Sequence, residues 1–421
     1  MKVSRRLKLV SLAAGTAALV TVPALSQQDG SGTTIARYTI DAGTVSGMAA
    51  MAAGGNGGVG AAMAMMRGGG NQVAHELVLR LGSTRSTSEP SADHFMPAGA
   101  RLGASVPLVT PPRAGPAQPG TPGMPQGQMP QARLLLFWGC GEHAGPGQPV
   151  VIDFSRLARG EVPPGLYAQG VDLPEAWSVL ASNSTTYGDW PNARDSKTVP
   201  ANSSLIGAHR IAGNYSPEIA FNLSDDFMPA LRGTSRDMAS GAVGLSWNAV
   251  TRATGYYAWA IAANPDERGQ TRDMVWWTSS STQQFGGPMS DWLSPAAVSR
   301  LVQAGTVMPS SQTNCTIPAE VKQAAGGPVM MTNLYAYGPE ANFSFPERPA
   351  NAPRGWQPDW IARVRFRAST MLMAGMPGMG DFEDSGTGES AEAGEAPPQS
   401  TLPRCRGGLR GVAERAAGLC Q

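Results

Sequence analysis

Gly241–Ser280 reads GAVGLSWNAVTRATGYYAWAIAANPDERGQTRDMVWWTSS, and this stretch decides the fold. Near its start, Val243, Leu245 and Trp247 alternate with small or polar residues. A period of two places the apolar side chains on one face of a strand and the polar ones on the other. The stretch is therefore predicted to begin with a strand that has one buried face.

Two more strands are predicted in the same stretch. Turn residues separate the first strand from Tyr256–Ala262, in which the side chains again alternate between two faces. Asn-Pro-Asp-Glu at 264–267 ends this strand, because these residues are typical of turns. Met274–Thr278, which is rich in aromatic residues, makes the third strand. Three short strands separated by turns predict an antiparallel sheet in a two-layered or closed β architecture.

These residues resemble a known family. Leu245–Val250 (LSWNAV) followed by Ala253–Tyr256 (ATGY) is similar to the second and third strands of a fibronectin type III domain, especially the bacterial extracellular kind. Thr313–Pro318 resembles the fifth strand of that domain, Leu334–Glu340 the sixth and Trp360–Met371 the seventh. The resemblance implies a sandwich fold, and it implies no particular ligand, because folds of this kind carry many binding roles.

The resemblance places a fibronectin type III-like domain at residues 225–372. Residues 286–312 form a long insertion before its fifth strand. Within the insertion, Ser294–Ala304 is predicted to be a short helix with Ser294 as its N-cap.

Residues 27–224 are predicted to form a first, mostly β domain, so the fold class is all-β with two sandwich-like domains. Its expected strands are Thr33–Thr44, Val73–Leu81, Arg101–Val109, Arg133–Trp138 and Pro149–Phe154, followed by a hairpin over Ser204–Asn222. Two low-complexity runs interrupt it: Gly47–Asn71 is rich in Gly, Ala and Met, and Pro111–Gln131 is rich in Pro and Gly. We interpret both runs as flexible excursions.

Residues 1–26 are typical of a secretory signal peptide. Four basic residues precede the apolar run Leu9–Val22, and Ala24–Ser26 offers small residues before a cleavage point near Gln27. A retained membrane anchor is the alternative, but the run is shorter than the ~20 residues that span a bilayer. We therefore expect an exported protein in the periplasm, on the outer surface or outside the cell, with no transmembrane segment in its mature chain.

Residues 373–421 are predicted to be a disordered tail. Asp381–Ser400 contains six acidic residues and no basic ones, with little apolar content to bury. A short arginine-rich segment with two cysteines follows. The formal net charge of the whole chain is +1, and no basic stripe or polybasic run predicts nucleic acid or anionic lipid as a partner.

The chain has four cysteines, Cys140, Cys315, Cys405 and Cys420. In an exported protein an even number favours disulfides, and four cysteines allow three sets of pairings. We favour Cys405–Cys420 because it is local, and Cys140–Cys315 because both residues lie among predicted strands. Four free thiols remain the alternative.

The most compact group of reactive residue types is Trp138–His143, which reads WGCGEH. Cys140, Glu142 and His143 have side chains that can bind a metal or form a thiol–imidazole pair. Their spacing does not suit one rigid helix or strand, so a tight turn with a disulfide is the favoured interpretation. The other histidines, His75, His94 and His209, form no metal-binding motif. We expect no catalytic residues, no metal and no cofactor.

Aromatic residues of the second and third strands suggest a binding surface. If Tyr256 points into the core, Tyr257 and Trp259 point to the other face. Either Trp276 or Trp277 of the neighbouring strand can join them, and we expect Trp277. Rings on a sheet face can stack on sugar rings or contact apolar side chains of a protein. The alternative is that the first domain or the insertion covers this face.

These observations favour an exported, non-catalytic binding or adhesion protein of the cell envelope. Its expected partner is an envelope polysaccharide or an envelope protein. An enzyme acting on envelope polysaccharide, with the fibronectin-like domain as an accessory, is the first alternative, because paired carboxylates need not form a local motif. A copper-binding protein is the second, because three methionine-rich runs, 48–66, 124–129 and 371–379, carry thioethers that suit Cu(I).

Overall fold

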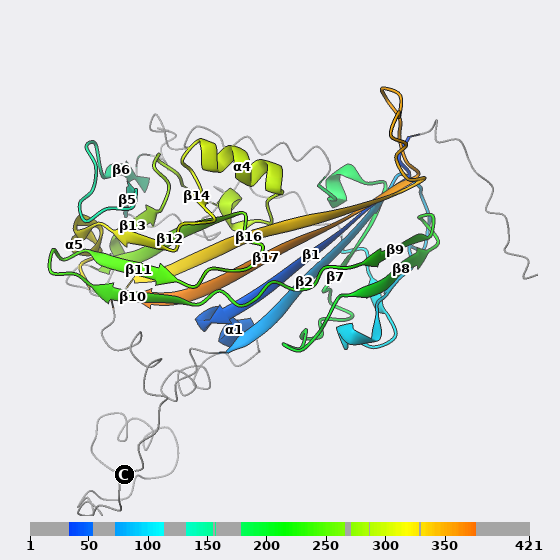
Figure 1. Ribbon diagram of the computed structural model, residues 1–421, viewed down its shortest axis with the longest axis horizontal. Coiled ribbons are helices and arrows are strands. Elements are labelled where there is room, and N and C mark those ends of the chain that lie inside the picture. Colours follow the sequence, from blue (N-terminus) through cyan, green and yellow to red (C-terminus); the bar gives the residue numbers. More distant parts are fainter. Residues whose placement is uncertain are drawn as a thin grey trace, which may run out of the picture. The chain divides into compact units, whose positions relative to one another are not determined.

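Three β-sheets make up most of the regular secondary structure in the described residues of the computed structural model (Figure 1). The structure describes residues 33–53, 72–112, 132–154, 156, 178–265, 271–285, 287–327 and 330–375. The predicted signal peptide, most of the two low-complexity runs, the tail after Gly375 and the pair Cys405–Cys420 lie outside these residues. The prediction of an all-β fold is confirmed.

The largest sheet contains ten strands. In spatial order they are β6 (Val150–Asp153), β5 (Arg133–Trp138), β13 (Thr271–Thr278), β12 (Gly255–Pro265), β16 (Met330–Phe345), β17 (Trp360–Ala374), β1 (Ala36–Gly47), β2 (Val73–Ser83) and β7 (Thr186–Trp190), with β14 (Met308–Pro309) paired to β12. Most neighbours are antiparallel, but β1 pairs with β17, and β5 with β13, in parallel. The long strands β16, β17, β1 and β2 run side by side in Figure 1.

Two smaller sheets complete the β structure. One has the order β4 (Val106–Leu108), β3 (Ala92–Phe95), β8 (Gly207–Gly213) and β9 (Ile219–Leu223); the other has the order β10 (Gly233–Asp237), β11 (Val243–Trp247) and β15 (Asn314–Ile317). The described residues include the short helices α1 (Met48–Ala53), α4 (Pro295–Gln303) and α5 (Ala319–Ala325), and the 3₁₀ turns η2 (Ala98–Ala100), η3 (Ala181–Asn183) and η4 (Gly287–Ser290).

The large sheet is continuous across the predicted domain boundary near residue 225. Strands β1, β2, β5, β6 and β7 precede that residue and β12, β13, β16 and β17 follow it, yet all belong to one sheet. The described residues all lie in one compact unit, Met1–Gly380. The parallel pairing of Ala36–Gly47 with Trp360–Met371 makes this connection, and it joins segments that are far apart in the sequence.

The main core lies between one face of the large sheet and the two smaller sheets. Alternate residues of β17, such as Val364 and Phe366, point into it, as do Tyr38 and Ile40 of β1. Leu245 of β11 and residues of β8 and β9 belong to the same apolar cluster. The period-two alternation of the strands thus buries one face of the large sheet, as the sequence predicts.

The insertion covers part of the opposite face. Helix α4 contacts β12 and β16, and Val298 and Leu301 from α4 bury Tyr257 and Tyr337. Ser294 caps the helix, because its Oγ accepts a hydrogen bond of 3.2 Å from the backbone N–H of Ala297. The prediction of this helix and of its N-cap is confirmed.

Two local predictions need correction. The run from Gly47 was expected to be a flexible loop, but β1 ends at Gly47 and Met48–Ala53 forms α1. Alanine and methionine favour helix, and Ala50 and Met51 are buried. The strand expected at Arg101–Val109 is reduced to Val106–Leu108. The predicted hairpin over 204–222 is confirmed by antiparallel β8 and β9.

Candidate functional site

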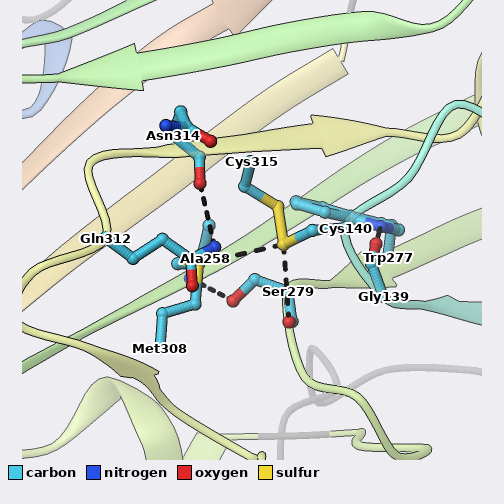
Figure 2. Close-up of a disulfide and its surroundings, with 9 residues drawn as sticks. All are labelled: Gly139, Cys140, Ala258, Trp277, Ser279, Met308, Gln312, Asn314 and Cys315. Atoms are coloured by element: carbon cyan, nitrogen blue, oxygen red, sulfur yellow. Dashed lines mark hydrogen bonds between the residues drawn. A yellow bond between two sulfur atoms is a disulfide. The ribbon is translucent and has the colours of Figure 1, made fainter.

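Cys140 and Cys315 form a disulfide, which confirms that predicted pair. Their Cα atoms are 5.0 Å apart and their sulfur atoms 2.10 Å apart. Cys140 follows β5 in the large sheet, whereas Cys315 is a buried residue of β15 in the three-stranded sheet. The Cys140 sulfur lies 3.7 Å from the carbonyl oxygen of Ser279 and 3.8 Å from the sulfur of Met308. Figure 2 shows these neighbours. The bridge therefore links two sheets.

Backbone hydrogen bonds hold the loop around Cys140 on both sheets. The N–H of Gly139 donates to the carbonyl of Thr278, and the indole N–H of Trp277 donates to the carbonyl of Gly139, both at 2.9 Å. On the other side, the N–H of Gly141 donates to the carbonyl of Thr316 at 3.0 Å. Gly139 has φ +99°, a conformation that favours glycine. The WGCGEH sequence thus makes a cross-linked turn.

Glu142 and His143 do not join Cys140 in a reactive group. The imidazole of His143 is exposed and lies 3.1 Å from Glu320 of α5, whose carboxylate also accepts the N–H of Ala144 at 2.9 Å. That backbone N–H is the largest cause of the lowered pKa of Glu320. Within the described residues, no group of three or more His, Cys, Asp or Glu side chains is placed to hold a metal ion. The loop therefore has a structural role, because it connects the large sheet to the three-stranded sheet.

The predicted aromatic face is only partly assembled. Tyr256 points into the main core, and Trp259 is half-buried on the opposite face. Tyr257 shares that opposite face but is only 2% exposed, because the insertion covers it. Trp277 is fully buried in the main core, on the far side of the sheet from Trp259. Tyr257 and Trp277 therefore do not form a surface with Trp259.

Trp276 takes the place expected for Trp277. The register pairs Ile261 with Trp276 and Ala260 with Trp277, so Trp276 is the residue that shares a face with Trp259. The two indoles stack with centroids 4.6 Å apart and planes 11° apart, and Phe285 meets Trp276 edge-on at 5.3 Å. Neither indole N–H has an acceptor among the described residues. We call Trp259, Trp276 and Phe285 the tryptophan cluster.

Apolar neighbours extend the tryptophan cluster along the sheet. Ile261 pairs with Met331 of β16, which pairs in turn with Met373 of β17, so these three side chains lie in a row with Trp276. Ile261 and Met373 are half-buried and Met331 is 37% exposed. This end of the face is therefore apolar and partly accessible.

A charged strip made of Asp41, Glu76, Arg80, Arg365 and Arg367 lies farther along the same face, and no sequence motif predicts it. Asp41 of β1 is fully buried and accepts two hydrogen bonds from Arg365 of β17, at 2.7 and 3.0 Å. Arg80 of β2 adds a third contact to Asp41 at 2.5 Å. A buried carboxylate needs such partners, because an isolated charge in the interior is strongly unfavourable.

The charged strip also holds the insertion on the sheet. Arg365 donates to the carbonyl of Trp292 at 2.6 Å, and Arg367 donates to the carbonyl of Ser290. The Arg367 guanidinium lies 3.8 Å from the centroid of the Trp292 ring and pairs with Glu76 at 2.8 Å. The sequence signal is the alternation Arg363-Val-Arg-Phe-Arg367, in which one face of a strand is charged throughout.

Two of the histidines, His94 and His209, form a buried hydrogen-bonded chain with Tyr38, which no sequence motif predicts. Tyr38 Oη lies 2.8 Å from His94 Nδ1, His94 Nε2 lies 3.0 Å from His209 Nδ1, and His209 Nε2 lies 2.7 Å from the carbonyl of Leu205. Burial lowers the pKa of His94 well below its usual range, and His209 lowers this pKa further. Burial is also the main cause of the lowered pKa values of His209 and His75.

The methionine-rich runs are described only in part. Met48, Met51, Met371 and Met373 lie on α1 and β17, which contact each other. The run at 124–129 and the other methionines of the first and third runs lie outside the described residues. The copper alternative therefore stays a prediction.

Among the described residues, the structure contains no helix with the length and apolar character needed to cross a membrane.

No protein-family model matches the chain, and no curated protein matches its sequence.

Proposed function

We propose that the protein is an exported, non-catalytic binding or adhesion protein of the cell envelope, and that it binds through the tryptophan cluster. The observation that carries this proposal is the half-buried Trp259, which stacks on the buried Trp276 beside the partly accessible Ile261 and Met331. Flat indole surfaces next to apolar side chains suit the apolar faces of sugar rings and the side chains of a protein partner.

Hydrogen-bond donors favour an envelope polysaccharide over an apolar partner. The N–H groups of Trp259 and Trp276 lie next to the stacked rings and lack acceptors among the described residues. A buried donor without an acceptor costs about 1–3 kcal/mol. A ligand with many hydroxyl oxygens would relieve this cost once it reaches between the surrounding side chains, whereas an aliphatic side chain would not.

Export is the second part of the proposal. It rests on residues 1–26, with their basic start and apolar run, and on the Cys140–Cys315 disulfide. Disulfides persist in oxidising compartments and are rare in the cytosol. N-terminal sequencing of the protein recovered from a periplasmic or extracellular fraction tests this part, with a start near Gln27 as the expected result.

The fibronectin type III-like character of residues 225–372 also remains a proposal. In its favour, β10, β11 and β15 make one sheet, and β12, β13, β16 and β17 are neighbours in another, with a shared apolar cluster between them. Two antiparallel sheets around one core are the architecture of that family. This part of the proposal concerns the scaffold and not the ligand.

Co-sedimentation tests the binding function. The full chain is mixed with peptidoglycan, with insoluble polysaccharides and with isolated outer membrane, and both pellet and supernatant are analysed for protein and for sugar. We expect the protein in the pellet of a polysaccharide, with no sugar released. Soluble sugar in the supernatant would favour the polysaccharide-acting enzyme, and no sedimentation with any material would contradict the proposal.

A further inference from the structure

We infer that the hydrogen-bonded chain Tyr38–His94–His209 is an acid-sensitive contact between two sheets. It holds the sheet β4–β3–β8–β9 against the large sheet at neutral pH, and it weakens when a histidine is protonated. Tyr38 belongs to β1, His94 to β3 and His209 to β8, so the chain crosses from one sheet to the other. All three side chains are buried. This inference is independent of the proposed binding function.

The direction of each hydrogen bond follows from the end of the chain. The Leu205 carbonyl can only accept, so His209 carries its proton on Nε2 and its Nδ1 is an acceptor. His94 must then donate from Nε2 to His209, and its Nδ1 accepts from the hydroxyl of Tyr38. Every nitrogen in the chain is used, and both rings are neutral.

An additional proton on either histidine disrupts this arrangement of hydrogen bonds. On His209 it would put two N–H groups opposite each other, because His94 already donates to that nitrogen. On His94 it would make the hydroxyl of Tyr38 an acceptor, and the buried hydroxyl proton would then have no acceptor among the described residues. The rings also have apolar surroundings, since His209 stacks on Phe221, which stacks on Phe343 of β16. A charged imidazole here loses its hydration, and no carboxylate is among the groups that act on His94 or His209.

The groups that act on the chain do not supply a counter-charge. Tyr38 faces His94 from β1, and Tyr215, between β8 and β9, acts on Tyr38. Tyr215 in turn is influenced by Asp189 and Tyr187 of β7. The tyrosines have raised pKa values and are therefore neutral, and the carboxylate of Asp189 acts on Tyr215 and not on the histidines. These neighbours therefore leave the two imidazoles neutral.

His75 adds a second point at the same interface. It lies on β2 and stacks on Phe227, which follows β9, with ring centroids 3.8 Å apart. Burial lowers its pKa, while Asp226 and a hydrogen bond with the Pro200 backbone partly oppose that shift. Protonation of His75 would disturb a flat contact between the large sheet and the segment that leaves the four-stranded sheet.

The remaining histidine lies elsewhere. The chain has four, and His143 is exposed in the disulfide loop, with a side chain that is 71% accessible. The three-stranded sheet β10–β11–β15 is joined to the large sheet by Cys140–Cys315, which does not titrate. Acid is therefore expected to loosen β3, β8 and β9 while β11 and β15 stay in place.

Hydrogen exchange followed by mass spectrometry tests this inference on the full chain. Exchange is measured at about pH 7.5 and about pH 5, on either side of the ordinary histidine pKa of about 6.5, and corrected for the intrinsic pH dependence of exchange. Below the pKa of about 6.5 that a histidine has in the open state, each histidine that is protonated only in that state increases opening about tenfold for each pH unit. We expect at least a tenfold loss of protection in β3, β8 and β9, with little change in β11, β12 and β15.

His94→Gln is the informative variant, because its amide oxygen can accept from Tyr38 and its amide nitrogen can donate to His209. In this variant β3, β8 and β9 should stay protected from exchange at neutral pH, and their protection should depend less on pH than in the unmodified protein. His143→Gln is the matched control and should behave like the unmodified protein. Unchanged protection of β8 and β9 at the lower pH, or an equal loss in all three sheets, would overturn the inference; the unmodified protein decides this even if His94→Gln does not fold.

Discussion

Asp41 and Arg365 lie 324 residues apart in the sequence and face each other as direct partners in the parallel pair β1–β17. Arg365 donates from Nε to Oδ1 at 2.7 Å and from Nη2 to Oδ2 at 3.0 Å, and Asp41 is fully buried. The same guanidinium donates to the carbonyl of Trp292 in the insertion. One ion pair thus connects the first described strand, the last one and the segment that covers them.

Replacing Asp41 should destabilise the whole unit. Asp41→Asn keeps the shape of the side chain and removes its charge, so two guanidinium groups lose their carboxylate. Breaking a buried ion pair from one side costs about 3–5 kcal/mol. Urea unfolding of this variant should show a loss of that size. The control is Asp237→Asn, whose partner is Lys322 in an exposed pair, and which should cost less than about 1 kcal/mol.

Replacing Arg367 should loosen the insertion without unfolding the protein. Arg367→Lys retains the positive charge, but an ammonium group cannot lie flat on the Trp292 ring while it also pairs with Glu76 and reaches the carbonyl of Ser290. Hydrogen exchange in 289–303 should therefore become faster, while exchange in β11 stays unchanged. Equal exchange of the variant and the parent in 289–303 would show that the apolar contacts of α4 hold the insertion alone.

The disulfide is expected to make a large contribution to stability. Cys140 and Cys315 are separated by 175 residues, and the chain-entropy argument gives about 5 kcal/mol for a loop of this length. The double variant Cys140→Ala/Cys315→Ala should lose up to this amount in urea unfolding. The control, Cys405→Ser/Cys420→Ser, keeps the bridge. A double variant as stable as the parent would mean that the backbone hydrogen bonds of the loop suffice.

Stability should fall as the pH drops below about 6.5. The pKa values of His94 and His209 are lowered in the folded state, so the unfolded chain binds more protons in this range. The free energy of unfolding is therefore highest above the unfolded pKa of about 6.5, and it decreases towards the lower folded pKa values by about 1.4 kcal/mol per pH unit for each histidine. Urea unfolding between neutral and mildly acidic pH measures this slope, which His143→Gln should leave unchanged.

Local patterns in the sequence predict much of the fold. The alternation in Gly241–Ser280 predicts three strands, and β11, β12 and β13 confirm them. Ser294 predicts the start of α4 because the N-cap interaction is local. Cys140–Cys315 is also predicted correctly. These features depend on residues close in sequence, or on covalent chemistry with few possible partners.

Features set by long-range register are not predicted. Trp276 and Trp277 are neighbours on one strand, so they occupy opposite faces, and only the pairing with β12 decides which of them joins Trp259. In the same way, Asp41 and Arg365 meet only because β1 and β17 are parallel partners. The continuity of the sheet across residue 225 has the same origin.

Binding by the tryptophan cluster is the central claim, and an affinity measurement on matched tryptophan variants tests it most directly. Binding of the parent, Trp259→Ala and Trp356→Ala to the polysaccharide found by co-sedimentation is measured as a function of protein concentration. Trp356 lies in the loop between β16 and β17 and serves as the control. Since stacking contributes about 0.5–1.5 kcal/mol beyond the area it buries, Trp259→Ala should weaken binding at least several-fold, and Trp356→Ala should not. Equal affinities of the parent and a folded Trp259→Ala would contradict the claim.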